Sequence, residues 1–594
     1  MIAKETEATG SEDWQKIAAA KKLEQGRRIP EDWKLKEEVL AAANSITDQR
    51  PIAASSGLLS ERELLITGDK HDATSLAAAI AAGTYSAEEV VTAFCKRAAI
   101  GHQLCNNLTE IMFGDAIEDA KKLDKVFQET GKTVGPLHGL PMTFKECFHV
   151  KGYDASNGYI SRTFDPSTYT TPLIELVKSR GAVVIAKTNT PQTMLVAECH
   201  NNVFGQTKNP VVSHLTCGGS SGGEGSNMAF GGSALGIGTD VGGSIRIPAA
   251  ANGVYGCKPS FGVLPMIGYA ASGYSGANTG VPAVSGPLAR SARDLSLLAR
   301  VVRDAKPWQF DPAVIPQVME NGTQSRKPVI GVIHKSGLTP HPPVRRAIQE
   351  AANKLSAAGF VVKDFVPTDF QDIRSITREL FTLDGLSYQR GQLEKAREPP
   401  VPSVEKIGFW TIPRKSHEEA WAFNGKKLAI QKDMLDRWQA AGVDLVIAPA
   451  GPHTAVLPGD WTNDTYTVCW NAVDVSLPKL ASSGNAGLME SSSQYPAVIM
   501  PYTTANPEVD LEDVSFVPMH DLDAEVQALC EWSTFSRHAS LTFSPGGLSS
   551  LTSIDDPQLM AGAPVALQLV GARLGDEQLL KDVELIDAVL RGNL

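Results

Sequence analysis

The chain has 594 residues, of which 42% are hydrophobic and 20% charged, and its formal net charge is −11. This composition supplies enough apolar material for a large globular core and excludes a disordered or fibrous chain. The acidic balance, and the lack of Lys/Arg runs longer than pairs, argue against a nucleic-acid partner. We therefore expect a small-molecule substrate.

The N-terminal stretch MIAKETEATGSEDWQ is polar and lacks the apolar core of a signal peptide. No apolar run approaches the roughly 18 residues of a transmembrane span. The eight cysteines are scattered without a C-x-x-C pair, so neither a disulfide framework nor a zinc site is predicted. The sequence thus predicts a cytoplasmic protein without a membrane span.

Residues 11–45 are charged and alanine-rich with helical spacing, and Pro30 interrupts them. They predict one or two surface helices. We assign residues 1–60 to a helical N-terminal extension and residues 61–594 to one large domain, because no Pro/Ser/Gly-rich linker divides the middle of the chain.

The large domain alternates helical and strand patterns. Ser86 and Glu89 have the spacing of a capping box, which predicts a helix start. Further along, the patterns predict a helix at 172–179, a strand at 182–186, a strand at 328–333, a helix at 344–358, a strand at 360–364 and a helix at 576–590. This alternation predicts an α/β fold with a mixed, largely parallel twisted sheet and helices on both faces.

The stretch from Cys217 to Ala250 is unusually rich in glycine. Tight turns and close packing alone could account for it. A dinucleotide fingerprint fails because Val241 stands where the third glycine belongs, and no P-loop lysine follows. The run Gly218–Gly222 matches the nucleophile-elbow pattern G-x-S-x-G, but the preceding segment 211–216 is a weak strand.

Taken together, GGSSGGEG, GTDVGGSIRIPAA and GVYGCKPSFGVLP, with GPLHGLPMTFKECFHVKG upstream, resemble the signature of the amidase signature family. The resemblance runs from about residue 55 to the C-terminus. It is strongest to fungal acetamidase-type general amidases, through CKRAA, PQTM and the terminal GAPVALQLVGARL, whereas fatty acid amide hydrolase is more distant.

This resemblance implies a Ser-Ser-Lys triad in which Ser244 is the nucleophile, Ser220 the bridging serine and Lys145 the base. It also implies a cis peptide bond between Gly219 and Ser220. Ser-Lys variants of acyl-transfer machinery need no histidine. A lysine acts as a base only when its pKa is lowered, and Lys145 follows the apolar run LPMTF, which favours such a shift.

The glycines before Ser244 have a use in this chemistry, because backbone N–H groups can approach an oxyanion only where no side chain blocks them. The amides predicted to form the oxyanion hole are those of Val241, Gly242, Gly243 and Ser244, with Ser220 and the backbone of Met194 beside the substrate. The family role of Asp240 and Arg246 is to support the loop.

Each residue also has a simpler interpretation. Without the family pattern, Lys145 would be interpreted as an ordinary surface lysine. Ser220 would be interpreted as a loop residue whose hydroxyl bonds its own backbone. Met194 would be interpreted as a residue of the hydrophobic core. Asp240 and Arg246 would be interpreted as a surface ion pair.

Two segments depart from the family pattern, near 475–494 and near 530–554. Both are rich in Ser and Gly and are predicted to be long surface loops or disorder. A further hypothesis for the first is in-frame translation of a retained intron, since Val475-Ser476 and Gln494 can be encoded by splice-site sequences.

The sequence therefore predicts an amidase that hydrolyses carboxylic amides, with small aliphatic amides such as acetamide as substrates and no metal or organic cofactor. The alternatives are a fatty acid amide hydrolase-like activity, a glutamine amidotransferase subunit, or an inactive amide-binding paralogue. The oligomeric state, including a homodimer, stays open.

Overall fold

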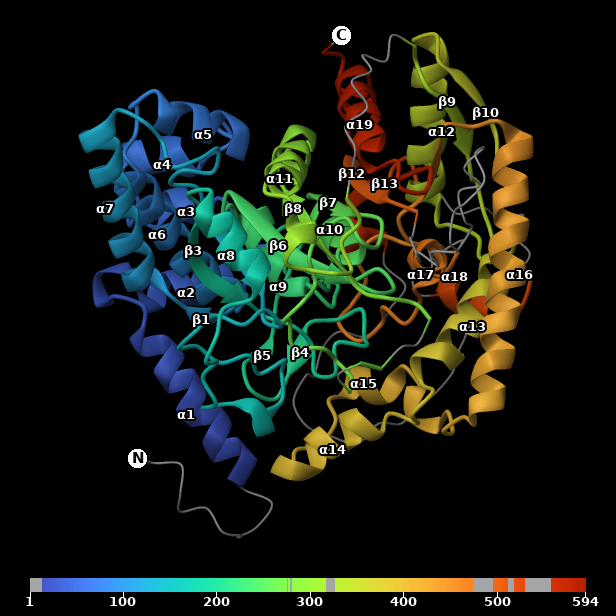
Figure 1. Ribbon diagram of the computed structural model, residues 1–594, viewed down its shortest axis with the longest axis horizontal. Helices are drawn as coiled ribbons and strands as arrows, with labels where there is room; N and C mark the ends of the chain where they lie inside the picture. The colour runs from blue at the N-terminus through green and yellow to red at the C-terminus, as the bar shows by residue number, and fades with distance from the viewer. Residues whose placement is uncertain are drawn as a thin grey trace.

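A computed structural model describes residues 13–274, 276–277, 280–316, 326–473, 495–510, 518–528 and 557–593 (Figure 1). The two segments that depart from the family pattern, 475–494 and 530–554, lie outside these ranges. None of the helices in the described part of the chain combines the length and apolarity needed to cross a membrane.

Helices dominate the first third of the chain. They are α1 (Asp13–Arg27), α2 (Glu37–Ala43), α3 (Ile52–Ser55), α4 (Glu61–Thr67), α5 (Ala73–Ala81), α6 (Ala87–Cys105) and α7 (Phe113–Thr130), with a 3-10 turn, η1, at Glu31–Trp33. The predicted helices on either side of Pro30 are present. One prediction is corrected: Ser86 caps α6 by accepting the Glu89 N–H, but the Glu89 side chain binds Arg62 instead of completing a capping box.

Within the described residues, an 11-stranded sheet forms the centre of the molecule. Its strands are β1 (Leu108–Ile111), β2 (Pro141–Lys145), β3 (Val183–Thr188), β6 (Leu235–Asp240), β7 (Tyr255–Lys258), β8 (Val284–Ala289), β9 (Val329–Val332), β10 (Val361–Asp364), β11 (Leu445–Pro449), β12 (Ala497–Thr504) and β13 (Pro564–Gly571). They lie in the order β1-β3-β2-β6-β8-β7-β12-β13-β11-β9-β10. A separate two-stranded sheet pairs β4 (His200–Asn201) with β5 (Gly205–Gln206).

Parallel pairs join β3, β2 and β6 in one half of the sheet and β11, β9 and β10 in the other, with antiparallel pairs between them. The predicted strand–helix–strand unit is β9, α12 (Pro342–Ala357) and β10, and its strands are parallel. The predicted helices α8 (Pro172–Ser179) and α19 (Asp576–Leu590) are also present.

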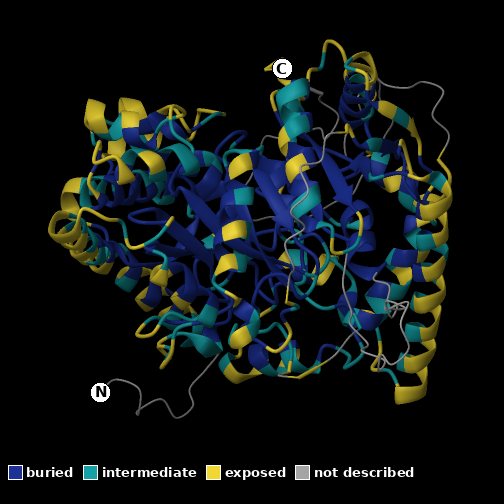
Figure 2. Cartoon of the chain, turned by 45° about the horizontal axis from the view of Figure 1, so that its top comes forward, coloured by how far each residue is buried: buried dark blue, intermediate teal, exposed yellow. Residues whose placement is uncertain are grey.

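Helices cover both faces of the sheet, which confirms the predicted fold class. Ala566 of β13 lies in an apolar cluster with α9 (Gly222–Phe230) and α10 (Arg246–Asn252). Its neighbour Leu567 lies in a cluster with Leu579 of α19. Because successive strand residues point to opposite faces, these helices lie on opposite sides. Figure 2 shows the strands buried between helices whose outer sides are exposed.

The remaining helices include α11 (Ala292–Asp304), α13 (Phe370–Phe381), α14 (Ser387–Ala396), α15 (Pro402–Lys406), α16 (His417–Ala441), α17 (Thr465–Ala472) and α18 (Asp521–Ala528). Short 3-10 turns lie at Ile160–Arg162, Pro307–Gln309, Phe409–Thr411 and Pro557–Met560. In Figure 1 the long helix α16 runs along the side of the molecule opposite α1–α7.

Candidate active site

The predicted site residues meet at one edge of the sheet because β2 and β6 are parallel neighbours. Parallel strands place their carboxyl ends at the same edge. Lys145 is the last residue of β2, and Asp240 is the last residue of β6. The loop that follows β6 carries Ser244, and the loop before α9 carries Ser220.

Lys145 lies beneath these loops and is 1% exposed. Its Nζ donates hydrogen bonds to Ser220 Oγ at 2.6 Å and to Thr239 Oγ1 at 2.8 Å. Within the described residues no carboxylate lies at ion-pair distance from this amine. Burial lowers the pKa of Lys145, because desolvation penalises the charged ammonium. The surface-lysine interpretation is therefore excluded.

Ser220 is also 1% exposed, and the Gly219–Ser220 peptide bond is cis. The Thr190 hydroxyl donates to the Ser220 carbonyl at 3.0 Å. The next residue, Ser221, donates its N–H to the Ser244 carbonyl at 3.0 Å. This bond connects the two serine-bearing loops directly.

Ser244 lies between β6 and α10 and lines a small cavity together with Gly219. Across the ranges the structure describes, no hydrogen-bond partner is found for the Ser244 hydroxyl. The structure thus brings Lys145 and Ser220 into direct contact and places Ser244 in the adjoining cavity.

The backbone amides of the loop are not equivalent. The Gly243 N–H donates to Asp240 Oδ1 at 2.9 Å, so this amide is already occupied and differs from its predicted role in an oxyanion hole. No acceptor among the described residues takes the N–H groups of Val241, Gly242 and Ser244. Val241 and Gly242 line the cavity, and Gly243 has a φ of 134°, a conformation that side chains rarely adopt.

Asp240 and Arg246 form a buried ion pair at 2.9 Å, and both side chains are 0% exposed. Burial alone would raise the pKa of Asp240, but the Arg246 charge and hydrogen bonds hold it below its usual value. The Asp240 carboxylate also accepts the N–H groups of Gly243 and Ile245. The pair therefore fixes the loop around Ser244, and the surface-pair alternative is excluded.

The cavity beside Ser244 has a volume of about 40 Å³. Its walls are mainly apolar and include Met194, Ile247, Phe381, Ile407, Phe409 and Trp461, with Asn463 and Asp464 as polar members. Met194 is only 7% exposed and also forms part of this wall, so it is both a buried residue and a cavity residue. A cavity of this size holds only a few water-sized groups.

Glu224 of α9 is fully buried and acts electrostatically on Lys145. Its carboxyl group accepts hydrogen bonds from the hydroxyls of Thr143 at 2.8 Å and Thr188 at 2.9 Å. Burial raises the pKa of Glu224 to about 8. A protonated Glu224 places no negative charge near the Lys145 amine.

Several residues of the site were not predicted. Thr239 contacts Lys145 and precedes Asp240 in the same motif, so its position gave a usable signal. Asn471 and Gln568 both hold Arg246, through Asn471 Oδ1 and Gln568 Oε1. They lie more than 200 residues away along the chain, and nothing in the sequence pattern indicated this contact.

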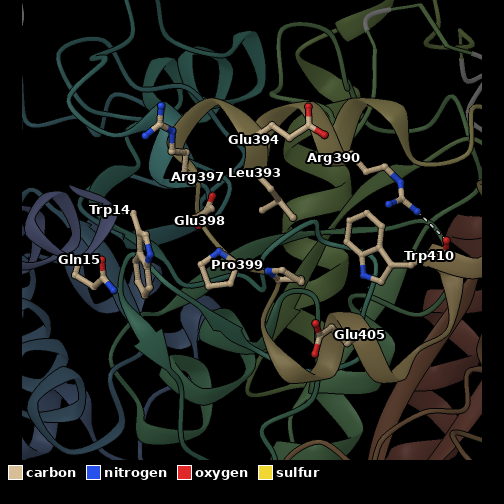
Figure 3. Close-up of a pocket in the computed structure, with 11 residues that line it drawn as sticks. Trp14, Gln15, Arg390, Leu393, Glu394, Arg397, Glu398, Pro399, Glu405 and Trp410 are labelled. Atoms are coloured by element: carbon tan, nitrogen blue, oxygen red, sulfur yellow. Dashed lines mark hydrogen bonds between the residues drawn. The ribbon is translucent and has the colours of Figure 1, made fainter. Parts of the chain in front are cut away.

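A larger cavity of about 920 Å³ opens elsewhere, between α1 and the segment 390–410 (Figure 3). Trp14, Arg390, Glu398 and Trp410 line it, and neither serine does. Ser244, by contrast, lines the smaller cavity.

Comparison with known proteins gives consistent results. A family model described as Amidase matches residues 89–580. The acetamidase of Aspergillus oryzae is 32% identical, with 98% of this chain and 99% of that protein covered. The acetamidase of Emericella nidulans is 33% identical with the same coverage.

Among solved structures, a fatty acid amide hydrolase superposes on the chain with a TM-score of 0.85. The two are 27% identical, and the match covers 98% of this chain and 95% of that one. The likeness therefore extends over nearly the whole architecture.

Proposed function

This chain belongs to the amidase signature family and is a hydrolase of amide C–N bonds; from that premise, we propose that it hydrolyses small aliphatic carboxamides, such as acetamide, to the acid and ammonia. The reaction proceeds through an acyl-enzyme on Ser244, with Ser220 and Lys145 as proton carriers. No cofactor takes part in this scheme.

The observation that carries the proposal is the contact between the buried Lys145 amine and the Ser220 hydroxyl, 2.6 Å apart, beside the cavity that Ser244 lines. A lysine surrounded by hydroxyls, without a carboxylate partner in the described chain, is favoured in its neutral form because burial lowers its pKa. A neutral amine can accept a proton at working pH.

In the first step, Ser244 Oγ attacks the amide carbonyl carbon while its proton passes to Ser220 Oγ, and the Ser220 proton passes to Lys145 Nζ. The N–H groups of Val241, Gly242 and Ser244 are the donors available to the oxyanion. When the tetrahedral intermediate collapses, the C–N bond breaks and Ser220 returns a proton to the leaving nitrogen, so ammonia departs. Water then releases the acid from Ser244 by the same route in reverse.

The size of the cavity supports small substrates. The Ser244 cavity is small, with a volume of about 40 Å³ and mainly apolar walls, which supports a small and weakly polar acyl group. The similarity to the acetamidases of two fungi agrees with this choice. The seven described cysteines are buried and free, which supports a reducing, cytoplasmic environment for the enzyme.

The test combines an activity series with a covalent probe. Purified protein is assayed for ammonia release from amides of increasing chain length, from acetamide to long-chain fatty amides, and labelled with a fluorophosphonate. We expect the highest kcat/KM on the shortest amides and labelling that Ser244→Ala abolishes. Preference for long-chain amides would replace the proposed substrate class, and labelling of Ser244→Ala would remove Ser244 from the mechanism.

A further inference from the structure

The turn that carries Met194 has an unfavourable backbone conformation. Thr193 and Met194 have φ values of 72° and 56°, a region that non-glycine residues seldom occupy. Such a conformation persists only where surrounding contacts enforce it. Because Met194 lines the Ser244 cavity, whatever holds this turn also shapes the substrate wall.

Gln192, in the same turn, supplies such contacts. Its side chain is fully buried, its Oε1 accepts the Val401 N–H at 2.9 Å, and its Nε2 donates to the Pro399 carbonyl at 3.1 Å. A backbone N–H can only donate and a carbonyl can only accept, so the orientation of this amide is fixed. The Gln192 NH₂ therefore also faces the carboxylate of Glu398, at 3.2 Å.

Glu398 is 4% exposed and accepts three hydrogen bonds. Its Oε1 takes the Ile160 N–H at 3.0 Å, and its Oε2 takes the amide groups of Gln192 at 3.2 Å and Asn202 at 3.3 Å. Asn202 also donates to the Pro399 carbonyl at 2.8 Å, which fixes its amide as well. All three partners are donors, so only a side chain with two acceptor atoms satisfies the site.

The segment after Glu398 separates the two cavities. Ile407 and Phe409 line the Ser244 cavity, whereas Glu398, Glu405 and Trp410 border the larger outer cavity (Figure 3). The Gln192–Glu398 contact therefore connects this dividing segment to the turn at Met194. The same hydrogen bonds thus connect two chain segments that contribute residues to the Ser244 cavity.

We propose that Glu398 is a positioning residue for amide hydrolysis: through the Gln192 side chain it holds Met194, and with it the wall of the Ser244 cavity, in place. The proposal rests on the proposed function. Glu398 itself does not touch the substrate, so its effect appears in substrate binding rather than in proton transfer.

Glu398→Gln tests this with almost no change in shape. The new NH₂ group must face one of three N–H donors, so one buried pairing is lost. Losing one buried hydrogen bond of this kind corresponds to about a tenfold effect on an equilibrium. Because burial raises the pKa of Glu398 to about 7, the assay is run above that pH, where the carboxylate is ionised. We then expect KM for acetamide to rise about tenfold, with kcat within about twofold of wild type. The matched control is Glu394→Gln, because Glu394 is exposed at the rim of the same outer cavity.

Two further variants separate positioning from general destabilisation. Gln192→Met removes the amide that connects Glu398 to the turn, and we expect KM to rise as in Glu398→Gln. The double variant should then be no worse than the poorer single one, because both changes break the same connection. Asn202→Ala removes another Glu398 contact outside the turn, and its KM should stay within about twofold of wild type.

A KM within about twofold of wild type in Glu398→Gln, or an equal rise in Asn202→Ala, would overturn the proposal. If Glu398→Gln does not fold, the KM of Gln192→Met takes its place, and a value within about twofold of wild type would overturn the proposal. Absence of amide turnover in the wild-type protein would overturn both proposals, whereas an active wild type with an unchanged Glu398→Gln variant overturns this one alone.

Discussion

The amine of Lys145 donates a 2.6 Å hydrogen bond to the hydroxyl of Ser220, and both side chains are almost completely buried. This contact joins two segments that are 75 residues apart in the chain. In the proposed reaction, Ser220 can pass its proton on only when the Lys145 amine is neutral, so the rate depends on the protonation state of this amine.

Replacing Lys145 with methionine keeps most of the apolar volume and removes the amine. We expect turnover of acetamide at neutral pH to fall by about 10²- to 10⁴-fold, the range typical of losing a general base. Ammonia release measures this, with circular dichroism as the check that the variant folds. Turnover equal to wild type would remove the lysine from the mechanism.

The same residue sets the direction of the pH dependence in the wild type. Only the neutral amine can accept the Ser220 proton, and burial lowers the pKa of Lys145. We therefore expect kcat/KM to fall as the pH is lowered through the lysine pKa and to reach a plateau above it. A profile that rises toward acid pH would contradict this assignment.

Glu224 makes stability depend on pH in the opposite sense from most carboxylates. Its pKa is raised from 4.5 to about 8 by burial, so between these values the folded protein holds a proton that the unfolded chain releases. The stability contributed by this proton is complete below pH 4.5 and is lost as the pH rises through about 8.

Glu224→Gln removes this component. We expect the free energy of unfolding of the variant, measured in urea at about pH 5 and about pH 8, to fall less with rising pH than that of wild type. Glu37→Gln, on an exposed helix end, is the control and should follow the wild-type curve. Identical pH dependence in wild type and Glu224→Gln would show that Glu224 is ionised throughout this range.

Lys21 of helix α1 is 3% exposed and pairs with Glu110 at 2.6 Å and Asp154 at 2.7 Å. Lys21→Met would leave two buried carboxylates without their cation. We expect the free energy of unfolding to fall by about 3–5 kcal/mol, as for other broken buried ion pairs.

The neighbouring Lys22 is exposed, so Lys22→Met is the matched control and should change stability by less than about 0.5 kcal/mol. Denaturant unfolding of both variants gives the comparison. Equal free energies of unfolding for the two variants would mean that Glu110 and Asp154 do not need the positive charge of Lys21.

Phe409 forms part of the wall that limits the Ser244 cavity. Phe409→Ala removes the ring, so we expect kcat/KM for hexanamide relative to acetamide to rise about tenfold or more. Phe310→Ala, at an exposed position, is the control. An unchanged chain-length preference would show that other residues set the limit.

Much of the fold could be predicted because its signals are local. The helix at 576–590 and the strand–helix–strand order at 328–364 follow from hydrophobic spacing and from glycine and proline boundaries. Of the capping box predicted at Ser86, only the serine cap is present, because the Glu89 side chain binds Arg62, 27 residues earlier. The roles of Lys145, Ser220 and Ser244 stay predictions, although the structure brings the first two into contact.

The sequence by itself determined the family, the α/β class and the residues on which the proposed chemistry depends, because these are written in short motifs with fixed spacing. The tertiary structure alone decided which amides of the loop are free, how small the cavity is, and which distant side chains hold Arg246 and Gln192. The reason is physical: hydrogen bonds and close packing depend on the direction and distance of groups brought together by the sheet, and no pattern within a short stretch of sequence records them.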